Sequence, residues 1–116
     1  MKWPKKQIPL DPDVNAITRD RGDECGISVS GRITIDSSPG LDALLRRSLD
    51  SAGCRFLTVD LYDVSYMDTS GLAMLVELLK AARTRGKTLR LSGLREKPRY
   101  LLQATRLLHL FQEEPR

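Results

Sequence analysis

The feature that most constrains the fold of this sequence is an abrupt change in its hydrophobic pattern near residue 68. The segment from Arg55 to Leu61 (RFLTVDL) is rich in aliphatic, aromatic and β-branched residues, which is typical of a largely buried strand. From Gly71 onward the apolar residues recur at the spacing of one helix face: Leu72, Leu75, Val76, Leu79 and Ala82. This spacing predicts a helix from Gly71 to about Arg85, which Gly86 ends. The segment Asp68-Thr69-Ser70-Gly71 is therefore expected to be a strand-to-helix turn.

A β-hairpin and a further helix are predicted before this unit. Apolar and polar residues roughly alternate over residues 14–19 and 25–34, and the intervening Asp20-Arg21-Gly22-Asp23 is a turn signal. Ser38 precedes Pro39, a pair typical of an N-cap followed by the first helical residue, and Gly53 is expected to close that helix. Its apolar stripe consists of Leu41, Leu44, Leu45 and Leu49.

The C-terminal third of the chain predicts one more strand and one more helix. Residues 87–92 alternate Leu89 and Leu91 with polar residues, and a helix is expected from about residues 96–98 until the pattern fades at residues 109–111. A hairpin followed by alternating helices and strands predicts an α/β fold with a mixed sheet of four to five strands and helices mainly on one face. Residues 1–12, with three prolines and three lysines, are interpreted as a flexible N-terminal arm, and residues 13–116 as a single domain.

Composition narrows the possible classes of function. A chain of 116 residues with 41% hydrophobic content can bury one core, and no apolar run approaches the roughly 18 residues of a membrane span, so a cytoplasmic protein is expected. The net charge of +4 is spread along the chain and aromatic content is only 5%, which favours a solvated surface over nucleic-acid binding. Cys25 and Cys54 form no C-x-x-C motif and are interpreted as buried free thiols, without a metal site or cofactor.

The hydroxyl residues of the turn allow two interpretations. A helix N-terminus leaves its first N–H groups unpaired and carries a partial positive charge, so Asp68 suits it as a cap. The same environment would accommodate a phosphate on Thr69 or Ser70. Residue types alone favour simple capping, because capping is the usual role of Asp, Thr and Ser at such a turn, and a modification site is the alternative.

A catalytic role is not favoured by the sequence. His109 is the single histidine, with no nucleophile assigned to it by the local sequence, and the phosphate-binding glycine motifs are absent. Asp60, Asp63 and Asp68 could in principle hold a cation or accept a phosphoryl group, but Asp68 is better placed as a cap and no lysine in the segment would neutralise the phosphoryl charge. We therefore expect neither an enzyme nor a metal centre.

From about Ile27 to Phe111 the chain resembles the STAS domain family, of the anti-sigma-factor antagonist type. Four segments carry the resemblance: Val29–Ile33 (VSGRI), Leu57–Leu61 (LTVDL), Asp63–Leu72 (DVSYMDTSGL) and Leu89–Leu94 (LRLSGL). In that family the hydroxyl residue directly after the second acid of the third segment is phosphorylated by a partner kinase, and here this position is Thr69, with Ser70 as the second candidate. The resemblance thus agrees with the predicted α/β architecture and favours the modification site.

The resemblance implies a bacterial protein of transcription regulation and stress response. Its partner would be a kinase-type anti-sigma factor, bound by the unphosphorylated form and released on phosphorylation of Thr69, with a PP2C-type phosphatase as a further candidate. The expected partner-binding residues are Asp63, Asp68, Thr69, Ser70, Gly71, Met74 and Leu78. Met74 is expected on the exposed face of the central helix, with Leu78 at its boundary, where a flexible thioether suits a binding surface.

Two alternatives remain open for the function. One is a scaffold or accessory STAS module in a stressosome-like or lipid-transport complex, and a large defined complex would favour it. The other is a sensor of a small ligand such as a nucleotide, which a ligand-dependent thermal shift would favour.

Overall fold

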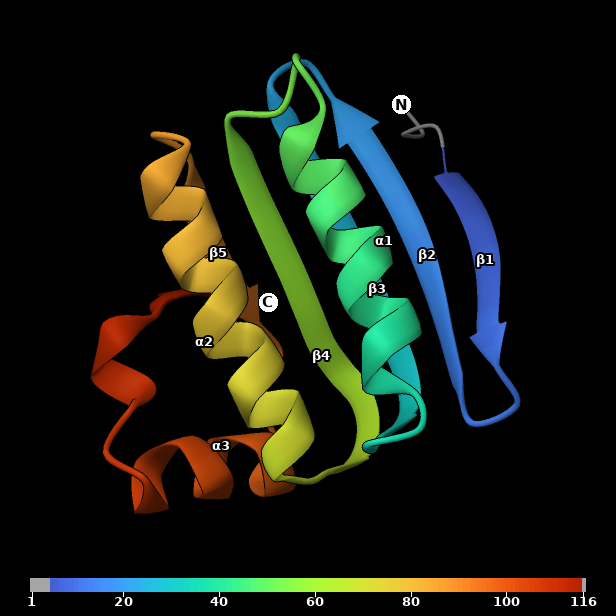
Figure 1. The fold of residues 1–116 in the computed structure, drawn as a ribbon, viewed down its shortest axis with the longest axis vertical. Coiled ribbons are helices and arrows are strands. Elements are labelled where there is room, and N and C mark those ends of the chain that lie inside the picture. Colours follow the sequence, from blue (N-terminus) through green and yellow to red (C-terminus); the bar gives the residue numbers. More distant parts are fainter. Residues whose placement is uncertain (1–4, 116) are drawn as a thin grey trace.

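Strands and helices alternate along residues 5–115, the part of the chain that the computed structural model describes (Figure 1). The elements are β1 (Lys5–Asp11), β2 (Val14–Arg21), β3 (Glu24–Ile33), α1 (Ser38–Asp50), β4 (Phe56–Met67), α2 (Thr69–Thr84), β5 (Thr88–Ser92), α3 (Glu96–Ala104), the 3-10 turn η1 (Leu108–Leu110) and β6 (Gln112–Glu114). The predicted hairpin, central helix and later strand are all present. No helix within residues 5–115 is long and apolar enough to cross a membrane.

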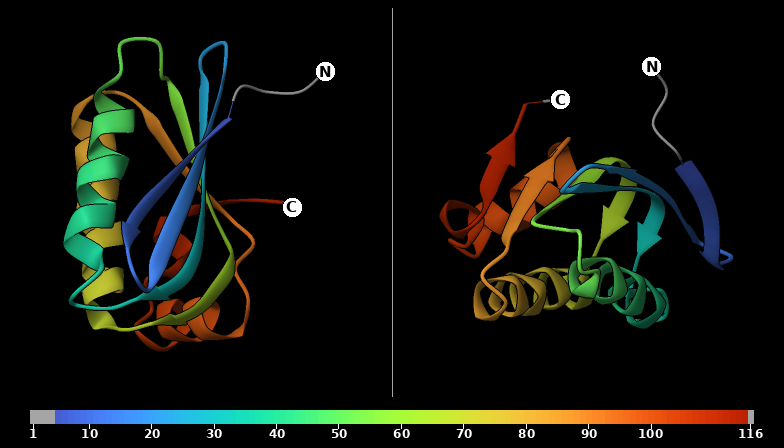
Figure 2. Two further views of the ribbon diagram at one scale, coloured as in Figure 1. Left: turned by 90° about the vertical axis from the view of Figure 1, so that its right-hand side faces the viewer. Right: turned by 90° about the horizontal axis from the view of Figure 1, so that it is seen from above.

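The strands form one mixed sheet in the order β1-β2-β3-β4-β5-β6. The first three strands pair antiparallel, whereas β3, β4, β5 and β6 pair parallel to one another. Helices α1 and α2 run side by side over one face and leave the opposite face open (Figure 2). The predicted α/β fold with helices on one face is confirmed. Over residues 5–115 the sheet has six strands rather than four to five, because β1 and β6 extend its two edges.

The expectation of a flexible N-terminal arm is wrong for residues 5–11. These residues form β1, which pairs antiparallel with β2 at the edge of the sheet. Pro9, a signal for irregular structure in the sequence, is tolerated there because an edge strand needs only one side of its backbone for pairing. The register shifts between Pro9 and Asp11. Residues 1–4 of the expected arm lie outside the described residues.

The core lies between the sheet and the helices. Buried residues alternate with less buried ones in the first half of β2 and along most of β3 and β5, and the four leucines of the predicted stripe in α1 are buried as well. Both cysteines are buried and free, as expected. Helix α2 contacts α1 on one side and α3 on the other, so its buried face is wider than one stripe. Its buried residues are Gly71, Leu72, Met74, Leu75, Leu78, Leu79, Ala81 and Ala82.

Strand β4 is longer than the pattern predicts and ends only at Met67. Two irregularities interrupt its pairing with β3, one between the pairs of Asp60 and Asp63 and one between those of Val64 and Tyr66. Each inserts one extra residue into β4, which is the geometry of a β-bulge and breaks the alternation on which a strand prediction depends. The bulged end of β4 leads directly into α2, which begins at Thr69 and not at Gly71.

The start of α1 differs from the prediction by one residue. Ser37, not Ser38, is the N-cap residue, and its side chain does not cap the helix. The Ser37 hydroxyl instead donates to the carbonyl of Arg32 (2.8 Å) and accepts from the N–H of Thr34 (2.9 Å). These bonds hold the loop to the end of β3. The helix ends at Asp50, before Gly53.

Candidate functional site

The turn between β4 and α2 is organised by the carboxylate of Asp68. Asp68 has the extended backbone of an N-cap residue, and its Oδ1 accepts from the N–H of Ser70 at 2.9 Å. The Ser70 hydroxyl donates to the same oxygen. The backbone N–H of Asp68 donates to the carbonyl of Ile33 at 3.1 Å, which joins the turn to the end of β3. The expected strand-to-helix turn with Asp68 as its cap is therefore present.

Asp68 is held in its charged form. The hydroxyl of Ser70, followed by the backbone N–H groups of Ser70, Gly71 and Ile35, lowers the pKa of the Asp68 carboxyl below its ordinary value, against a smaller opposing effect of burial. The adjacent start of α2 favours the same charged form through the partial positive charge of a helix N-terminus. A fixed negative charge thus lies beside the two hydroxyl residues of the turn.

The two candidate phosphorylation residues lie in different environments. Thr69 is the first residue of α2 and its side chain is exposed. Ser70 is half-buried, and its hydroxyl is used in the bond to Asp68. A kinase could therefore reach the Thr69 hydroxyl without breaking a bond of the cap, whereas phosphorylation of Ser70 would require that bond to break.

Gly71 brings α2 into close contact with the sheet. A Cβ atom at this position would lie 2.5 Å from Cγ of Met67 and 2.8 Å from Cγ2 of Ile33. A side chain here would push the start of α2 away from the ends of β3 and β4. Gly71 therefore has a packing role, and it is itself buried.

Asp63 lies in the bulged part of β4, near the start of α3. Its side chain is exposed and lines a pocket with Ser65, Arg95 and Lys97, the latter two at the start of α3. Arg95 is fixed there by stacking on the ring of Tyr62, 4.6 Å from its centroid. The structure thus places Asp63 on the same strand as the turn but beside the start of α3, where Arg95, Glu96 and Lys97 line the same pocket.

The expectation of an exposed Met74 with Leu78 at its boundary is wrong. Leu78 is fully buried and Met74 is 6% exposed, because α2 packs against α1 and α3 as well as against the sheet. Met74 does line a shallow groove between α1 and α2, together with Ser38, Arg46, Ser70 and Glu77. Leu78 is therefore not available to a partner, whereas Met74 forms part of the floor of a groove that begins beside the turn.

The loop between β3 and α1 is part of the same site, which the sequence did not indicate. The N–H of Ile35 donates to Oδ2 of Asp68 at 3.3 Å, so a single carboxylate joins residues that are 33 positions apart. Both helices begin at the same end of the molecule, as Figure 1 shows. No local pattern around Ile35 signals this bond, because it depends on the parallel pairing of β3 with β4.

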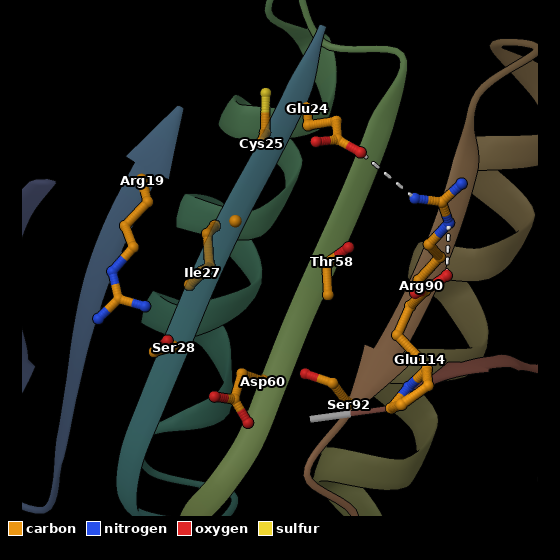
Figure 3. A pocket seen from close by; sticks show the side chains of 12 residues that line it. Arg19, Glu24, Cys25, Ile27, Ser28, Thr58, Asp60, Arg90, Ser92 and Glu114 are labelled. Carbon is orange, nitrogen blue, oxygen red and sulfur yellow. Dashed lines mark ion pairs between the residues drawn. The ribbon is translucent and has the colours of Figure 1, made fainter. Parts of the chain in front are cut away.

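A separate pocket of about 290 Å³ lies on the open face of the sheet (Figure 3). Arg90 of β5 forms ion pairs across it with Glu24 (3.8 Å) and Glu114 (3.2 Å) and stacks on the ring of Phe56. Cys25 lines one end, where burial raises the pKa of its thiol and makes it a poor nucleophile. The arginine that dominates this pocket is thus already paired with carboxylates of the protein.

The sequence matches a known protein family over most of its length. The family model described as "Mlab, STAS domain" matches residues 17–112. The anti-sigma-B factor antagonist of Staphylococcus aureus strain NCTC 8325 is 31% identical over 101 residues, which cover 87% of this chain and 91% of the relative. The chain belongs to the STAS domain family, among the anti-sigma-factor antagonists.

Solved structures share this fold at lower sequence identity. The crystal structure of an anti-sigma factor antagonist from Mycobacterium paratuberculosis superposes with a TM-score of 0.80 at 20% identity, covering 93% of this chain and 92% of that one. The structure of the Bacillus cell fate determinant SpoIIAA in its phosphorylated form has a TM-score of 0.67 at 12% identity, covering 85% and 90%. These likenesses confirm the architecture on which the turn is built.

Proposed function

We propose that this protein is a cytoplasmic regulatory binding module whose unmodified form binds a kinase-type anti-sigma factor and thereby releases a sigma factor. The binding surface comprises the turn from Asp68 to Gly71 and the groove between α1 and α2 that begins beside it. The observation that carries the proposal is that Thr69 is exposed at the start of a helix, next to Asp68. The Asp68 carboxylate accepts hydrogen bonds from Ser70 and does not need the Thr69 hydroxyl. Membership of the antagonist family supports the same class of partner.

Phosphorylation of Thr69 by the bound kinase would end the complex. The Thr69 oxygen attacks the γ-phosphorus of an ATP held by the kinase, the bond to the β,γ-bridging oxygen breaks and ADP leaves, while the hydroxyl proton passes to a base of the kinase. The product carries about −1.5 to −2 charges next to the ionised Asp68. The helix N-terminus tolerates this charge within the fold, but a partner in close contact meets added bulk and a larger negative charge. A phosphatase of the PP2C type would restore the binding form.

The test combines binding and phosphate transfer. Each kinase-type anti-sigma factor encoded in the native genome is purified with ADP, and its affinity for wild type, Thr69→Ala and Thr69→Glu is measured by calorimetry. Wild type and Thr69→Ala are expected to bind alike, and Thr69→Glu at least about tenfold more weakly. Equal affinity of Thr69→Ala and Thr69→Glu would contradict the switch.

Ser70→Ala is the matched control for the site of transfer. With ATP in place of ADP, mass spectrometry is expected to find a phosphate on wild type and on Ser70→Ala but none on Thr69→Ala. The opposite pattern would assign the modification to Ser70 and contradict the role of Thr69.

An accessory module of a larger complex is the second candidate function. The observation that favours it is the description of the matching family model, which names Mlab and not an anti-sigma factor. If this is the function, the protein would migrate in a stable high-mass complex during size-exclusion chromatography of native extract. Its intact mass would show no phosphate under any growth or stress condition.

A further inference from the structure

Ile35 is an unusually exposed aliphatic side chain. Among residues 12–115, whose side chains are described, the large hydrophobic residues that are exposed are Ile35 (73%), Tyr100 (70%) and Tyr62 (40%). Both tyrosines carry a hydroxyl that water can solvate, and Tyr62 is covered on one side by Arg95. Ile35 has no polar atom in its side chain, so its exposure leaves apolar surface in water with no compensating bond.

The loop that carries Ile35 is held in one shape by its own backbone bonds. The carbonyl of Thr34 accepts from the N–H groups of Ser37 (3.1 Å) and Ser38 (2.8 Å), and the Thr34 hydroxyl accepts from the N–H of Asp36 (3.2 Å). The Ser37 hydroxyl bridges the N–H of Thr34 and the carbonyl of Arg32. An apolar side chain on a loop with this many internal bonds loses little further conformational freedom when a partner covers it.

Asp68 places this loop beside the proposed phosphorylation site. Its Oδ1 caps the helix that begins with Thr69, and its Oδ2 accepts from the N–H of Ile35 at 3.3 Å. Ser38, which follows the loop, lines the groove between α1 and α2 that also contains Ser70. The Ile35 loop, the Thr69 turn and the groove are therefore neighbours. They lie at the end of the molecule where both helices begin (Figure 1).

We propose that Ile35 is the apolar anchor of the partner contact and inserts into an apolar pocket of the anti-sigma factor. This inference rests on the proposed function and adds to it the residue that supplies most of the affinity. Affinity at protein interfaces is concentrated in a few side chains that fill pockets, surrounded by contacts that exclude water. Ile35 would supply that affinity, and Thr69 the regulated contact next to it. The sec-butyl side chain requires a partner pocket lined by aliphatic or aromatic residues.

The experiment uses the same purified anti-sigma factors with ADP and the full-length protein. Ile35→Ala is expected to weaken binding at least about tenfold, and Ile35→Val by less than about threefold because one methyl group is lost. Tyr100→Ala, an equally exposed residue on α3, is the matched control and is expected to bind like wild type. The unfolding midpoint of each variant is expected to equal that of wild type, because neither side chain is in the core.

The outcomes separate this inference from the proposed function. If wild type and Thr69→Ala bind but Ile35→Ala binds equally well, the anchor is wrong and the proposed function stands. If wild type binds none of the anti-sigma factors, the proposed function fails and the inference fails with it. If sedimentation shows a homodimer that Ile35→Glu dissociates, the occupant of this surface is a second copy of the chain, and the inference is likewise overturned.

Discussion

The two helices that begin at the same end of the sheet start with nearly the same residues. Helix α1 opens with Ser38-Pro39-Gly40-Leu41 and α2 with Thr69-Ser70-Gly71-Leu72, so each has a hydroxyl residue first, a glycine third and a leucine fourth. Both leucines are buried, but the hydroxyl residue and the glycine exchange their exposure between the two helices. Ser38 is buried and Gly40 exposed in α1, whereas Thr69 is exposed and Gly71 buried in α2.

The connection that precedes each helix accounts for this reversal. α2 follows β4 with Asp68 as the single intervening residue, and the cap bond to Ser70 leaves the first hydroxyl residue outside. α1 follows β3 through residues 34–37, and Ser37 is bonded back to the strand and does not cap the helix. The longer connection turns the first residue of α1 inward. A hydroxyl residue at a helix start is thus a candidate modification site only where the preceding connection leaves it exposed.

The sharpest test of this comparison places the same charge at both helix starts. Ser38→Glu would bury a carboxylate at a position that is 8% exposed, and we expect it to reduce the free energy of unfolding by roughly 2 kcal/mol or more. Thr69→Glu places its carboxylate in solvent, where attraction to the helix N-terminus and repulsion from Asp68 oppose each other, so a change within about 0.5 kcal/mol is expected. Urea denaturation measures both values, and Ser38→Ala is the control for loss of the hydroxyl alone.

Equal destabilisation by the two glutamates would mean that the two starts are not differently exposed in solution. In that case Thr69 would lose its advantage over other hydroxyl residues as the acceptor of a phosphate.

A second, smaller contrast uses the two glycines. Gly71→Ala places a methyl group within 3 Å of side-chain atoms of Met67 and Ile33, and overpacking of this kind costs about 1–3 kcal/mol. Gly40→Ala adds a methyl group at an exposed helical position and is expected to stabilise the protein by about 0.5–1 kcal/mol, because alanine favours the helix. Opposite signs of the two changes in thermal or urea unfolding are the expected result. A stabilising Gly71→Ala would show that α2 does not approach the sheet this closely.

Local patterns were sufficient to predict the hairpin, the parallel α/β region and the cap at Asp68. These features depend on residues close in sequence: an alternating pattern around a turn, a helical stripe, and an acid before a helix. The Ser38-Pro39 pattern predicted the N-cap of α1 one residue too late, because Ser37 is the N-cap residue. The cap position there depends on the bond from Ser37 to Arg32 at the end of a strand.

The errors came from contacts between elements distant in sequence. Pairing with β2 makes a strand of residues 5–11 despite Pro9, and packing of α2 between α1 and α3 buries Met74 and Leu78. The bond from Ile35 to Asp68 also requires the sheet to be formed before the two residues meet. The strand-to-helix turn that carries Thr69 could therefore be predicted from residues close in sequence, whereas the surface around it could not.

The smallest expected effect concerns the negative charge of the Asp68 carboxylate, which accepts hydrogen bonds from Ser70 in α2 and from Ile35 in the loop before α1. Because hydrogen bonds from Ser70 and its neighbours lower the folded-state pKa of Asp68, the charged carboxylate stabilises the native protein at pH values above its ordinary pKa of 3.8. This contribution is lost as the pH falls through the lower, folded-state pKa. Asp68→Asn keeps a capping side chain but has no titrating group.

Wild type is therefore expected to be more stable than Asp68→Asn at pH 6, by an amount on the order of 0.5 kcal/mol, typical of a charge at a helix N-terminus. The difference should shrink below pH 4 and vanish or reverse near pH 2. Urea unfolding at each pH measures the difference, and Asp42→Asn, which removes the carboxylate of the half-buried ion pair with Arg46 in α1, is the control for carboxylates in general. A difference that does not change between pH 6 and pH 2 would mean that Asp68 joins the two helix starts by shape alone. The negative charge of Asp68 would then make no measurable contribution to the stability of the fold.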